Sequence, residues 1–557
     1  MSLVEDVLPL EWRQRYGQFS TPLRLVHLIL GCAGYTPTAD LRGVRLLDPA
    51  CGAGNFLIAA ADRLLRAAAR NRWSRDVVRA ALAQNLWGLE VDAASCALAE
   101  LRLRSVLPAD LADVPLHLHQ VDSLALAPAS VFDIVVSNPP YLSGRRSDLS
   151  AYHWLAGQRD TYLLFVDLAC RMVKVGGMIG LVLPDPFLAR ANAEQARALL
   201  LRDFTLRRLL HIERVFHAYV GTVVLVARRA SPPPGQCVGW ARLRVSRWHA
   251  STAGKAIAAS ARGGAMRHGT VPQTVLSRQP LSALRYLLDE HAMALIERIS
   301  AGQGMPPMRL CAVAHIGRGE ELAKCSPRLM RQPGPNMLPV LLGGCEIRPF
   351  AVRFHGYYLP AAYVRKPRWL YQAPKILVVK STDRLTAALD TTGYVTLQTL
   401  YLVHAGHDII DLPVLLALLN SRLLRVYLLL TSTRYKLVQP QIEQHVLGDL
   451  PLPALSARDA AALRHLAWQL HHAYQEPIAE AQGAVSPSGG LLLSSSLTGK
   501  GGNGSTPAMH CAIDCQRVEW NGTADSLEAE LNALVNRLYG ITEAELALLE
   551  HAGLTLP

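Results

Sequence analysis

The chain has 557 residues, of which 50% are hydrophobic, and this length predicts a sizeable core and roughly two to four domains. No apolar run is long enough to cross a bilayer without a charge, and residues 1–15 are too polar and acidic for a signal peptide. A cytoplasmic protein is therefore expected, with no membrane partner. The formal net charge of +13 is compatible with a nucleic-acid partner but does not establish one.

Ten cysteines are scattered along the chain without paired spacing. Cys511 and Cys515 form the only close pair, and no second cysteine or histidine cluster follows at the spacing of zinc ligands. The sequence therefore predicts no metal site, and it predicts reduced thiols, as is usual in a cytoplasm.

Strand-like apolar runs alternate with amphipathic stretches over residues 43–230. Regular alternation of this kind predicts an α/β domain with a mostly parallel sheet. We expect strands at 43–48, 86–92, 116–122, 132–137, 178–184 and 222–229, and helices at 55–70, 93–106 and 162–177.

The composition changes after the proline-rich stretch "SPPPG" at 231–235, so the first domain is expected to cover residues 1–240. A connecting helical segment is expected at 241–304. Short strands among Pro- and Gly-rich turns, with a helix near 412–429, predict an α+β domain at 305–455. A helical tail should occupy 456–557, interrupted by a flexible low-complexity insertion at 486–507.

The first stretch that suggests chemistry is "LLDPACGAGNFL" at 46–57, where a strand ends in Asp48 and a loop containing Gly52 and Gly54 opens a helix. Glycines in such a loop let a ligand approach the backbone, and the helix start offers free N–H groups. The pattern is neither the P-loop nor the three-glycine dinucleotide fingerprint. On this evidence alone, a plain tight turn stays open.

Two further acids also end strands, which strengthens the prediction of a ligand site. Glu90 in "GLEVD" can bind both hydroxyls of a ribose, and Asp122 can receive an adenine amino group. Together with Asp48 they would lie at the carboxyl edge of the sheet, where open α/β sheets bind ligands.

A fourth strand runs into "NPPY" at 138–141. Pro139 and Pro140 fix their own φ angles and hold the residue before each of them extended. The Asn138 side chain and a backbone carbonyl therefore form a rigid pair of acceptors, and Tyr141 adds a flat ring. This arrangement suits a planar amine, with two acceptors for its N–H groups and one ring for stacking.

In this order, "LLDPACGAGNFL", "GLEVD", "VDS" and "NPPY" resemble the class I S-adenosylmethionine-dependent methyltransferases. More closely, they resemble the Taq-type DNA adenine-N6 methyltransferases of restriction-modification systems, with the gamma-class motif order. "GQFSTPLRLV" (17–26) resembles their first motif, and "VFHAYVGTVVLVARR" (215–229) resembles the motif whose aromatic packs on the target base. "VLLGGCEIRPF", "APKILVVKSTDRLTAALD" and "GDLPLP" are similar to their target-recognition domain.

The resemblance implies a Rossmann-like catalytic domain at 1–240 and a DNA-binding target-recognition domain at 305–455. It also implies methyl transfer from S-adenosylmethionine to the N6 amino group of a flipped-out adenine in double-stranded DNA. A separately encoded restriction endonuclease stays open as a partner. A nuclease within this chain is not expected, because the first motif begins near residue 20.

The resemblance also assigns roles to residues. The cofactor site would comprise Thr21, Asp48, Ala50, Cys51, Gly52, Gly54, Glu90, Val91, Asp122 and Asn138. Asn138, Pro139, Pro140 and Tyr141 would form the catalytic loop, with Tyr141 and Phe216 stacking on the target base. The candidate DNA contacts are Arg348, Arg353, Lys375, Lys380, Arg434 and Lys436. One position departs from the pattern, because Ser123 stands where related enzymes can have an aromatic against the cofactor's adenine.

Two alternatives remain at this stage. Cytosine N4, an RNA base or a protein glutamine presents the same planar amine. The order of motifs and the large C-terminal half favour DNA over RNA or protein, whereas cytosine N4 stays open because the spacing does not distinguish it from adenine N6. The second alternative is a catalytically inactive DNA-specificity subunit. The intact 138–141 segment and Glu90 argue against that alternative.

Overall fold

The computed structural model describes residues 20–141, 160–212, 221–243, 266–302, 306–380, 385–406, 410–431, 441–475 and 522–554. Phe216, Arg434, Lys436, Cys511, Cys515 and the expected insertion at 486–507 lie outside the described residues. The chain divides into two compact units. Unit 1 comprises Met1–Ala301, Val426–Val446 and Ala544–Pro557, and unit 2 comprises Gly302–Arg425 and Leu447–Glu543.

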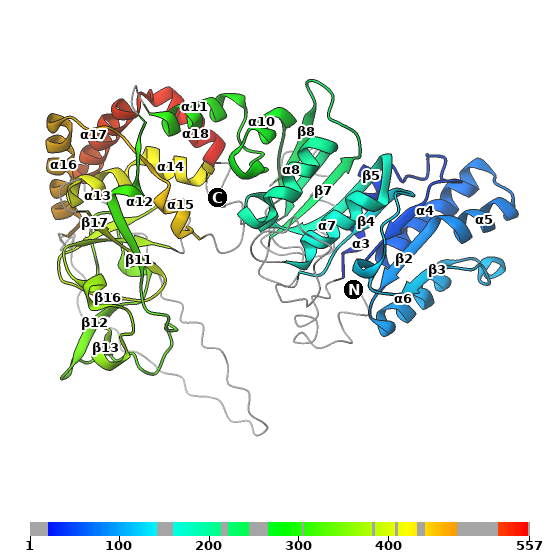
Figure 1. The fold of residues 1–557 in the computed structure, drawn as a ribbon, viewed down its shortest axis with the longest axis horizontal. Coiled ribbons are helices and arrows are strands. Elements are labelled where there is room, and N and C mark those ends of the chain that lie inside the picture. The colour runs from blue at the N-terminus through cyan, green and yellow to red at the C-terminus, as the bar shows by residue number, and fades with distance from the viewer. Residues whose placement is uncertain are drawn as a thin grey trace, which may run out of the picture. The chain divides into compact units, whose positions relative to one another are not determined.

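Unit 1 is built on a nine-stranded sheet in the order β3-β2-β1-β4-β5-β7-β6-β8-β9 (Figure 1). The strands are β1 (Leu46–Asp48), β2 (Leu86–Glu90), β3 (His117–Gln120), β4 (Phe132–Ser137), β5 (Val173–Pro184), β6 (Thr205–Ile212), β7 (Thr222–Arg228), β8 (Cys237–Leu243) and β9 (Met266–Pro272). Neighbours from β3 to β5 pair in parallel, as do β6 and β8. The other three pairs are antiparallel, so the predicted α/β class with a mostly parallel sheet is confirmed.

The helices of unit 1 are α3 (Leu23–Cys32), α4 (Asn55–Asn71), α5 (Arg75–Asn85), α6 (Ala93–Val106), α7 (Thr161–Met172), α8 (Glu194–Asp203), α10 (Gln273–Ser277) and α11 (Glu290–Ala301). The apolar sides of α3, α4, α5 and α6 are buried in one continuous core with residues of the sheet. Helix α3 packs against β5 and β7, and α7 packs against β4 and β5. The helix that begins within the segment 17–26 and the helix that bonds the segment 138–141 therefore both pack on β5.

One predicted helix ends earlier than expected. The sequence predicts a helix at 162–177, but α7 ends at Met172 and residues 173–177 belong to β5. Val173 and Val175 favour a strand because they are β-branched, and Gly176 adopts a φ of 82°. Strand β9 also lies beyond residue 240, so the sheet includes part of the stretch expected to connect two domains. The domain boundaries themselves stay a prediction.

Unit 2 contains three small sheets, and its α+β character agrees with the predicted fold class. A four-stranded antiparallel sheet comprises β11 (Ala314–Arg318), β17 (Leu400–Ala405), β14 (Lys375–Val379) and β15 (Ala387–Asp390). The others comprise β13 (Tyr358–Pro360), β12 (Met337–Leu341) and β16 (Val395–Thr396), and β10 (Met308–Arg309) with β18 (Pro451–Leu452). Its helices are α12 (Leu310–Val313), α13 (Leu412–Asn420), α16 (Ala457–Gln475) and α17 (Gly522–Tyr539).

Three helices have residues in both units: α14 (Arg422–Thr431), α15 (Gln444–Gly448) and α18 (Glu543–Leu554). In the described part of the chain, no single helix is long and apolar enough to span a membrane. Helices α13 and α14 reach that length and composition only as a pair, and the pair is bent by 64°. Leu415, Leu416 and Leu418 of α13 are all buried.

A buried ion pair joins β14 and β15 in unit 2. Lys375 Nζ donates to Asp390 Oδ2 at 2.5 Å and to the Tyr371 carbonyl at 2.9 Å, and both charged side chains are 0% exposed. Asp390 also accepts from the backbone N–H groups of residues 392–394. Burial lowers the pKa of Lys375. Lys375 therefore cannot contact DNA in this structure, and its selection as a candidate contact is wrong.

Removing one member of this pair should destabilise the four-stranded sheet. We expect Lys375→Ala to lower the local free energy of unfolding by about 3–5 kcal/mol, because it leaves a buried carboxylate uncompensated. Hydrogen–deuterium exchange of peptides from β14 and β17 would measure this loss. The exposed Lys324 provides the control, and Lys324→Ala should change exchange by less than about 0.5 kcal/mol. Equal protection in both variants would contradict the expectation.

Candidate active site

The glycine loop after β1 is accessible on one side and tightly packed on the other. Gly52 has a φ of 52°, and a Cβ placed there would have no heavy atom within 4 Å. Gly54 has a φ of 82° and directly precedes α4, and a Cβ there would lie 3.1 Å from the Cβ of Ala99. A ligand can therefore approach the backbone at Gly52, while Gly54 lets the loop pack against α6.

Glu90 connects this loop to the end of β2. Its Oε2 accepts from the Gly52 N–H at 2.8 Å, and its Oε1 accepts from the Asp92 N–H at 3.0 Å. The side chain is 9% exposed, so the two bonds hold a nearly buried carboxylate in one position. Val91 follows it and is 60% exposed, which leaves an apolar side chain uncovered beside the acid.

The end of β3 is attached to the same loop through the residue that departs from the family pattern. Ser123 is buried, and its hydroxyl donates to the carbonyl of Pro49. Asp122 is half-buried and accepts from the Leu124 N–H at 3.1 Å. Ser123 therefore holds the loop after β3 against the loop after β1, a role that the sequence did not indicate.

Two residues that the sequence analysis missed hold Thr21 in place. Asn55 Nδ2 donates to the Thr21 carbonyl at 2.7 Å and to Ser20 Oγ at 2.9 Å. Arg102 of α6 donates to Asn55 Oδ1 at 2.9 Å and to the Ala53 carbonyl at 2.5 Å. The one available signal was an asparagine at the start of an alanine-rich helix, where such a residue commonly bonds nearby backbone.

Asp48 is the last residue of β1 and is 1% exposed. Burial raises the pKa of Asp48 to about 8, and the neighbouring Glu90 carboxylate raises it as well. The Ala50 N–H donates to Asp48 Oδ1 at 3.2 Å and opposes that shift. Burial likewise raises the pKa of the Cys51 thiol, which makes it unreactive as a nucleophile.

The "NPPY" segment follows β4 directly and is attached to α7. Pro139 is buried, and the Thr161 hydroxyl donates to the Pro140 carbonyl at 2.7 Å. The Tyr141 hydroxyl donates to Asn138 Oδ1 at 3.3 Å. Burial raises the pKa of Tyr141 well above its usual value, so the ring carries a neutral hydroxyl. In this conformation the acceptor oxygen of Asn138 is already engaged by the protein.

Two further aromatic rings form a chain of edge-to-face contacts that begins at Tyr141. Tyr162 of α7 contacts it edge to face with a ring-centroid distance of 6.3 Å, and Phe187 contacts Tyr162 in the same way at 6.4 Å. Neither supporting ring was predicted, because residues on a helix and after a strand carry no local signal for this contact. The opposing ring expected at Phe216 lies outside the described residues.

Parallel pairing of β1 with β2 and β4 places the predicted site residues of these strands at one end of the sheet, where the strands have their carboxyl ends. The residues gathered there are Thr21, Asp48, Ala50, Cys51, Gly52, Gly54, Glu90, Val91, Asp122 and the 138–141 segment. Within the described residues, no cluster of three His, Cys, Asp or Glu side chains could hold a metal ion.

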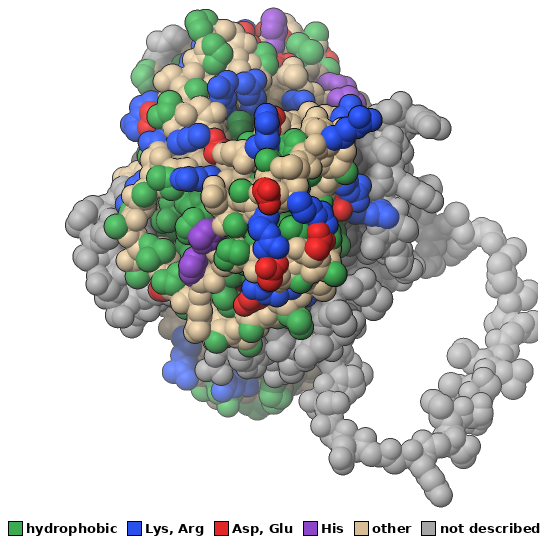
Figure 2. Space-filling view, turned by 90° about the vertical axis from the view of Figure 1, so that its right-hand side faces the viewer, with side chains coloured by type: hydrophobic (Ala, Val, Ile, Leu, Met, Phe, Trp, Pro, Cys, Tyr) green, Lys and Arg blue, Asp and Glu red, His purple; other side chains and the backbone are tan. Residues whose placement is uncertain are grey.

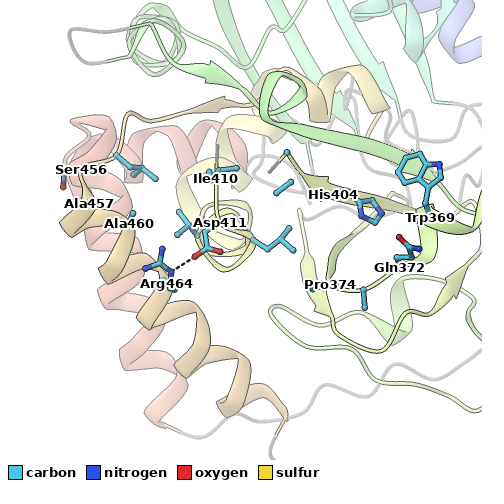
Figure 3. Close-up of a pocket in the computed structure, with 16 residues that line it drawn as sticks. Trp369, Gln372, Pro374, His404, Ile410, Asp411, Ser456, Ala457, Ala460 and Arg464 are labelled. Atoms are coloured by element: carbon cyan, nitrogen blue, oxygen red, sulfur yellow. Dashed lines mark hydrogen bonds and ion pairs between the residues drawn. The ribbon is translucent and has the colours of Figure 1, made fainter. Parts of the chain in front are cut away.

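A separate pocket of about 870 Å³ lies within unit 2. Figure 3 shows Asp411 and Arg464 paired on one wall and Trp369 and His404 on the other. None of the predicted site residues lines it. Of the candidate DNA contacts, Arg353 is exposed, and Arg348 and Lys380 are half-buried.

Three family models match segments of this chain, in its first half and in its second. Residues 339–452 match the TaqI-like C-terminal specificity domain, and residues 111–216 match the Eco57I restriction-modification methylase. Residues 28–152 match the RMKL-like methyltransferase domain.

This chain is also similar in sequence to individual type II methyltransferases. The chain is 30% identical over 207 residues to the type II methyltransferase M.PaeR7I of Pseudomonas aeruginosa, covering 34% of this chain and 36% of that protein. It is 24% identical over 458 residues to M.TthHB8I of Thermus thermophilus, covering 78% and 90%. The matches to four curated type II methyltransferases span only 36–43% of their lengths.

One solved structure shares the fold of the whole chain. The Type IIL restriction-modification enzyme MmeI, in complex with DNA, aligns with a TM-score of 0.61 at 11% identity. The alignment covers 100% of this chain and 81% of that chain. At this identity the likeness concerns the fold alone.

The raised pKa of Asp48 predicts a pH dependence of stability in the cofactor-free protein. The unfolded carboxyl loses its proton near pH 3.9, whereas the folded one keeps it to about pH 8. Stability should therefore fall as the pH rises between these values, by about 1.4 kcal/mol per pH unit from this group. Asp48→Asn removes that contribution, so the variant should gain stability relative to wild type over this range.

Urea unfolding of both proteins between about pH 5 and about pH 8 would measure the difference. The control is Asp113→Asn, because the Arg79 guanidinium lowers the pKa of exposed Asp113 and its titration ends below this range. A constant difference between wild type and Asp48→Asn would mean that Asp48 is ionised in the fold.

Proposed function

We propose that this chain, which belongs to the TaqI-like family of type II adenine methyltransferases, methylates the N6 amino group of adenine in double-stranded DNA with S-adenosylmethionine as donor. The observation that carries the proposal is the proline-braced segment 138–141, which lies at the same end of the parallel strands as the Glu90 carboxylate. A TaqI-like specificity domain on the same chain supports DNA as the substrate.

The described residues fit the cofactor. Gly52 leaves open space above the loop backbone, and Glu90 is held at the end of β2 where a ribose can be bound. The exposed Val91 supplies an apolar contact for an adenine ring, and Asp122 supplies an acceptor for its amino group. When bound, S-adenosylmethionine supplies an electrophilic sulfonium methyl group.

The chain's own part in the reaction is to activate a poor nucleophile. The lone pair of an adenine amine is delocalised into the ring, which makes the nitrogen planar and weakly nucleophilic. Acceptance of its two N–H groups by Asn138 Oδ1 and the Pro139 carbonyl would favour a pyramidal nitrogen. The same acceptors stabilise the positive charge that develops there, and losing one such group typically costs about 3 kcal/mol.

The target base must leave the duplex to reach this site, at a cost of a few kcal/mol. Stacking on Tyr141 and Phe216 would offset that cost, since one base–aromatic contact contributes about 1–3 kcal/mol. The Tyr141 hydroxyl donates to Asn138 Oδ1 at 3.3 Å. An amide oxygen has two lone pairs, so this bond leaves one of them for the amine.

Restriction-modification is the proposed biological setting, with a separately encoded restriction endonuclease as partner. The similarity to type II methyltransferases supports this setting. Cytosine N4 would satisfy the same acceptors, and mass spectrometry of nucleosides from methylated DNA distinguishes the two products.

The first prediction for this function concerns Asn138. Asn138→Ala should reduce methyl transfer to DNA by at least about 100-fold, because one of the two acceptors for the amine is lost. Cofactor affinity, measured by calorimetry, should change little, since the Glu90 and Gly52 bonds remain. Methyl transfer at the wild-type rate would remove the proposed role of this residue.

A second prediction separates the ring of Tyr141 from its hydroxyl. Tyr141→Phe keeps the stacking face and frees Asn138 Oδ1, so turnover should stay near or above that of wild type. Tyr141→Ala loses the stacking contact, and turnover should fall by about 5- to 150-fold. Single-turnover assays with saturating cofactor would test both variants. Equal losses in both would show that the hydroxyl is required.

A further inference from the structure

The surface charge of unit 2 is strongly one-sided between residues 306 and 406. The described residues of this stretch include twelve Lys and Arg but only four Asp and Glu. Glu320, Glu346 and Asp390 are buried, and each accepts hydrogen bonds from the protein itself. Among the described residues of the stretch, Glu321 is the only exposed acid.

In unit 1, two arginines of α5 and α6 form ion pairs with acids. Figure 2 looks onto the end of unit 1 that carries α5 and α6, where blue and red side chains are interspersed. Arg79 bonds Asp113 at 2.9 Å, and Arg104 bonds Glu100 at 2.8 Å. Both of these arginines are therefore paired with acids.

Two arginines of unit 2 are held by tyrosine rings instead of by acids. The guanidinium carbon of Arg328 lies 4.4 Å from the ring centroid of Tyr363, and that of Arg331 lies 4.1 Å from the ring centroid of Tyr357. Both arginines are exposed, and neither has a carboxylate partner within the described part of the chain. We call these four residues the arginine–tyrosine surface.

The backbone fixes this surface to an edge strand. Met330 exchanges two backbone hydrogen bonds with Tyr358 of β13, at 3.0 and 2.8 Å, so the loop carrying both arginines runs beside that strand. The two tyrosines flank β13 on either side in sequence. The surface is therefore built on ordered backbone rather than on an unsupported loop.

We propose that the arginine–tyrosine surface binds the phosphate backbone of double-stranded DNA. The inference rests on the proposed function, because it takes the substrate of that reaction as its partner. A ring against the face of a guanidinium does not occupy its in-plane N–H groups, and those groups match phosphate oxygens. Arg331 Nη1 also donates to the His355 carbonyl at 3.4 Å, and the other in-plane nitrogens of this arginine can meet a phosphate. The rings also restrict the arginine side chains beforehand, which reduces the entropy lost on binding.

The candidate DNA contacts chosen from the sequence did not include these arginines. Arg328 and Arg331 become candidate DNA contacts only when the structure shows that both are exposed, that tyrosine rings hold them and that the acids of this stretch are mostly buried. Phosphate contacts give affinity and orientation and carry no sequence information, so base recognition must use other residues.

The test measures binding of the full chain to a fluorescent duplex of arbitrary sequence over a range of salt concentrations. Each of Arg328→Gln and Arg331→Gln should reduce the slope of log affinity against log salt by about 0.9. Affinity near 0.1 M salt should fall roughly five- to tenfold per substitution. Arg79→Gln removes the same charge from an acid-paired arginine and should leave both quantities unchanged.

A second pair of variants tests the role of the rings. Tyr363→Leu keeps the arginine charge, so the salt slope should stay that of wild type while affinity falls about two- to fivefold. Tyr363→Phe keeps the ring and should bind like wild type. Cofactor affinity and the thermal transition report folding, and both should be unchanged in every variant.

The proposal is overturned if Arg328→Gln and Arg331→Gln retain the wild-type slope and affinity. It is also overturned if they lose affinity for single-stranded RNA but not for duplex DNA. Failure of the proposed function would look different, because the wild-type chain would then methylate no adenine in plasmid or genomic DNA. These variants should slow methylation at low DNA concentration and approach the wild-type rate at saturation.

Discussion

Parallel register of three neighbouring strands governs the candidate site. Leu46 of β1 is paired with Leu86 of β2 on one side and with Ile134 of β4 on the other. Asp48, Glu90 and Asn138 therefore reach the same edge from segments up to about ninety residues apart. A slip of one residue in either pairing would turn every side chain of that strand to the opposite face. The apolar residues of these strands are buried, and their burial prevents such a slip.

Hydrogen bonds then convert a shared edge into a defined site. Glu90 accepts from the backbone N–H of Gly52, in the loop after β1, and from that of Asp92, in the loop after β2. Ser123 joins the loop after β3 to the loop after β1. Asn55 holds the first motif against the same helix start. These bonds are favourable because, without them, the buried polar groups would have no hydrogen-bond partner. In the proposed reaction, the amine would meet side chains that these bonds already hold in position.

Between residues 306 and 406 of unit 2, most of the described acids are buried, whereas nearly all of the described basic residues are not. In unit 2, Glu346 lies inside the fold and accepts backbone N–H groups, while Arg328 stays outside against a tyrosine ring. Because the buried acids accept hydrogen bonds from the protein's own groups, few acids lie beside the exposed basic groups. In unit 1, pairs such as Arg79 with Asp113 cancel locally.

Local patterns were enough to identify the strand–helix alternation, the glycine loop, the three acids and the "NPPY" segment, because each depends on residues that are close together in the chain. They did not reveal that α7 stops at Met172, since the competition between helix and strand there depends on pairing with distant β4. Nor could they show that Lys375 faces Asp390 inside the protein while Arg328 faces Tyr363 outside it. Both are basic residues in similar surroundings of sequence. Which one meets solvent is set by contacts between segments far apart along the chain, and such contacts exist only once the chain is folded.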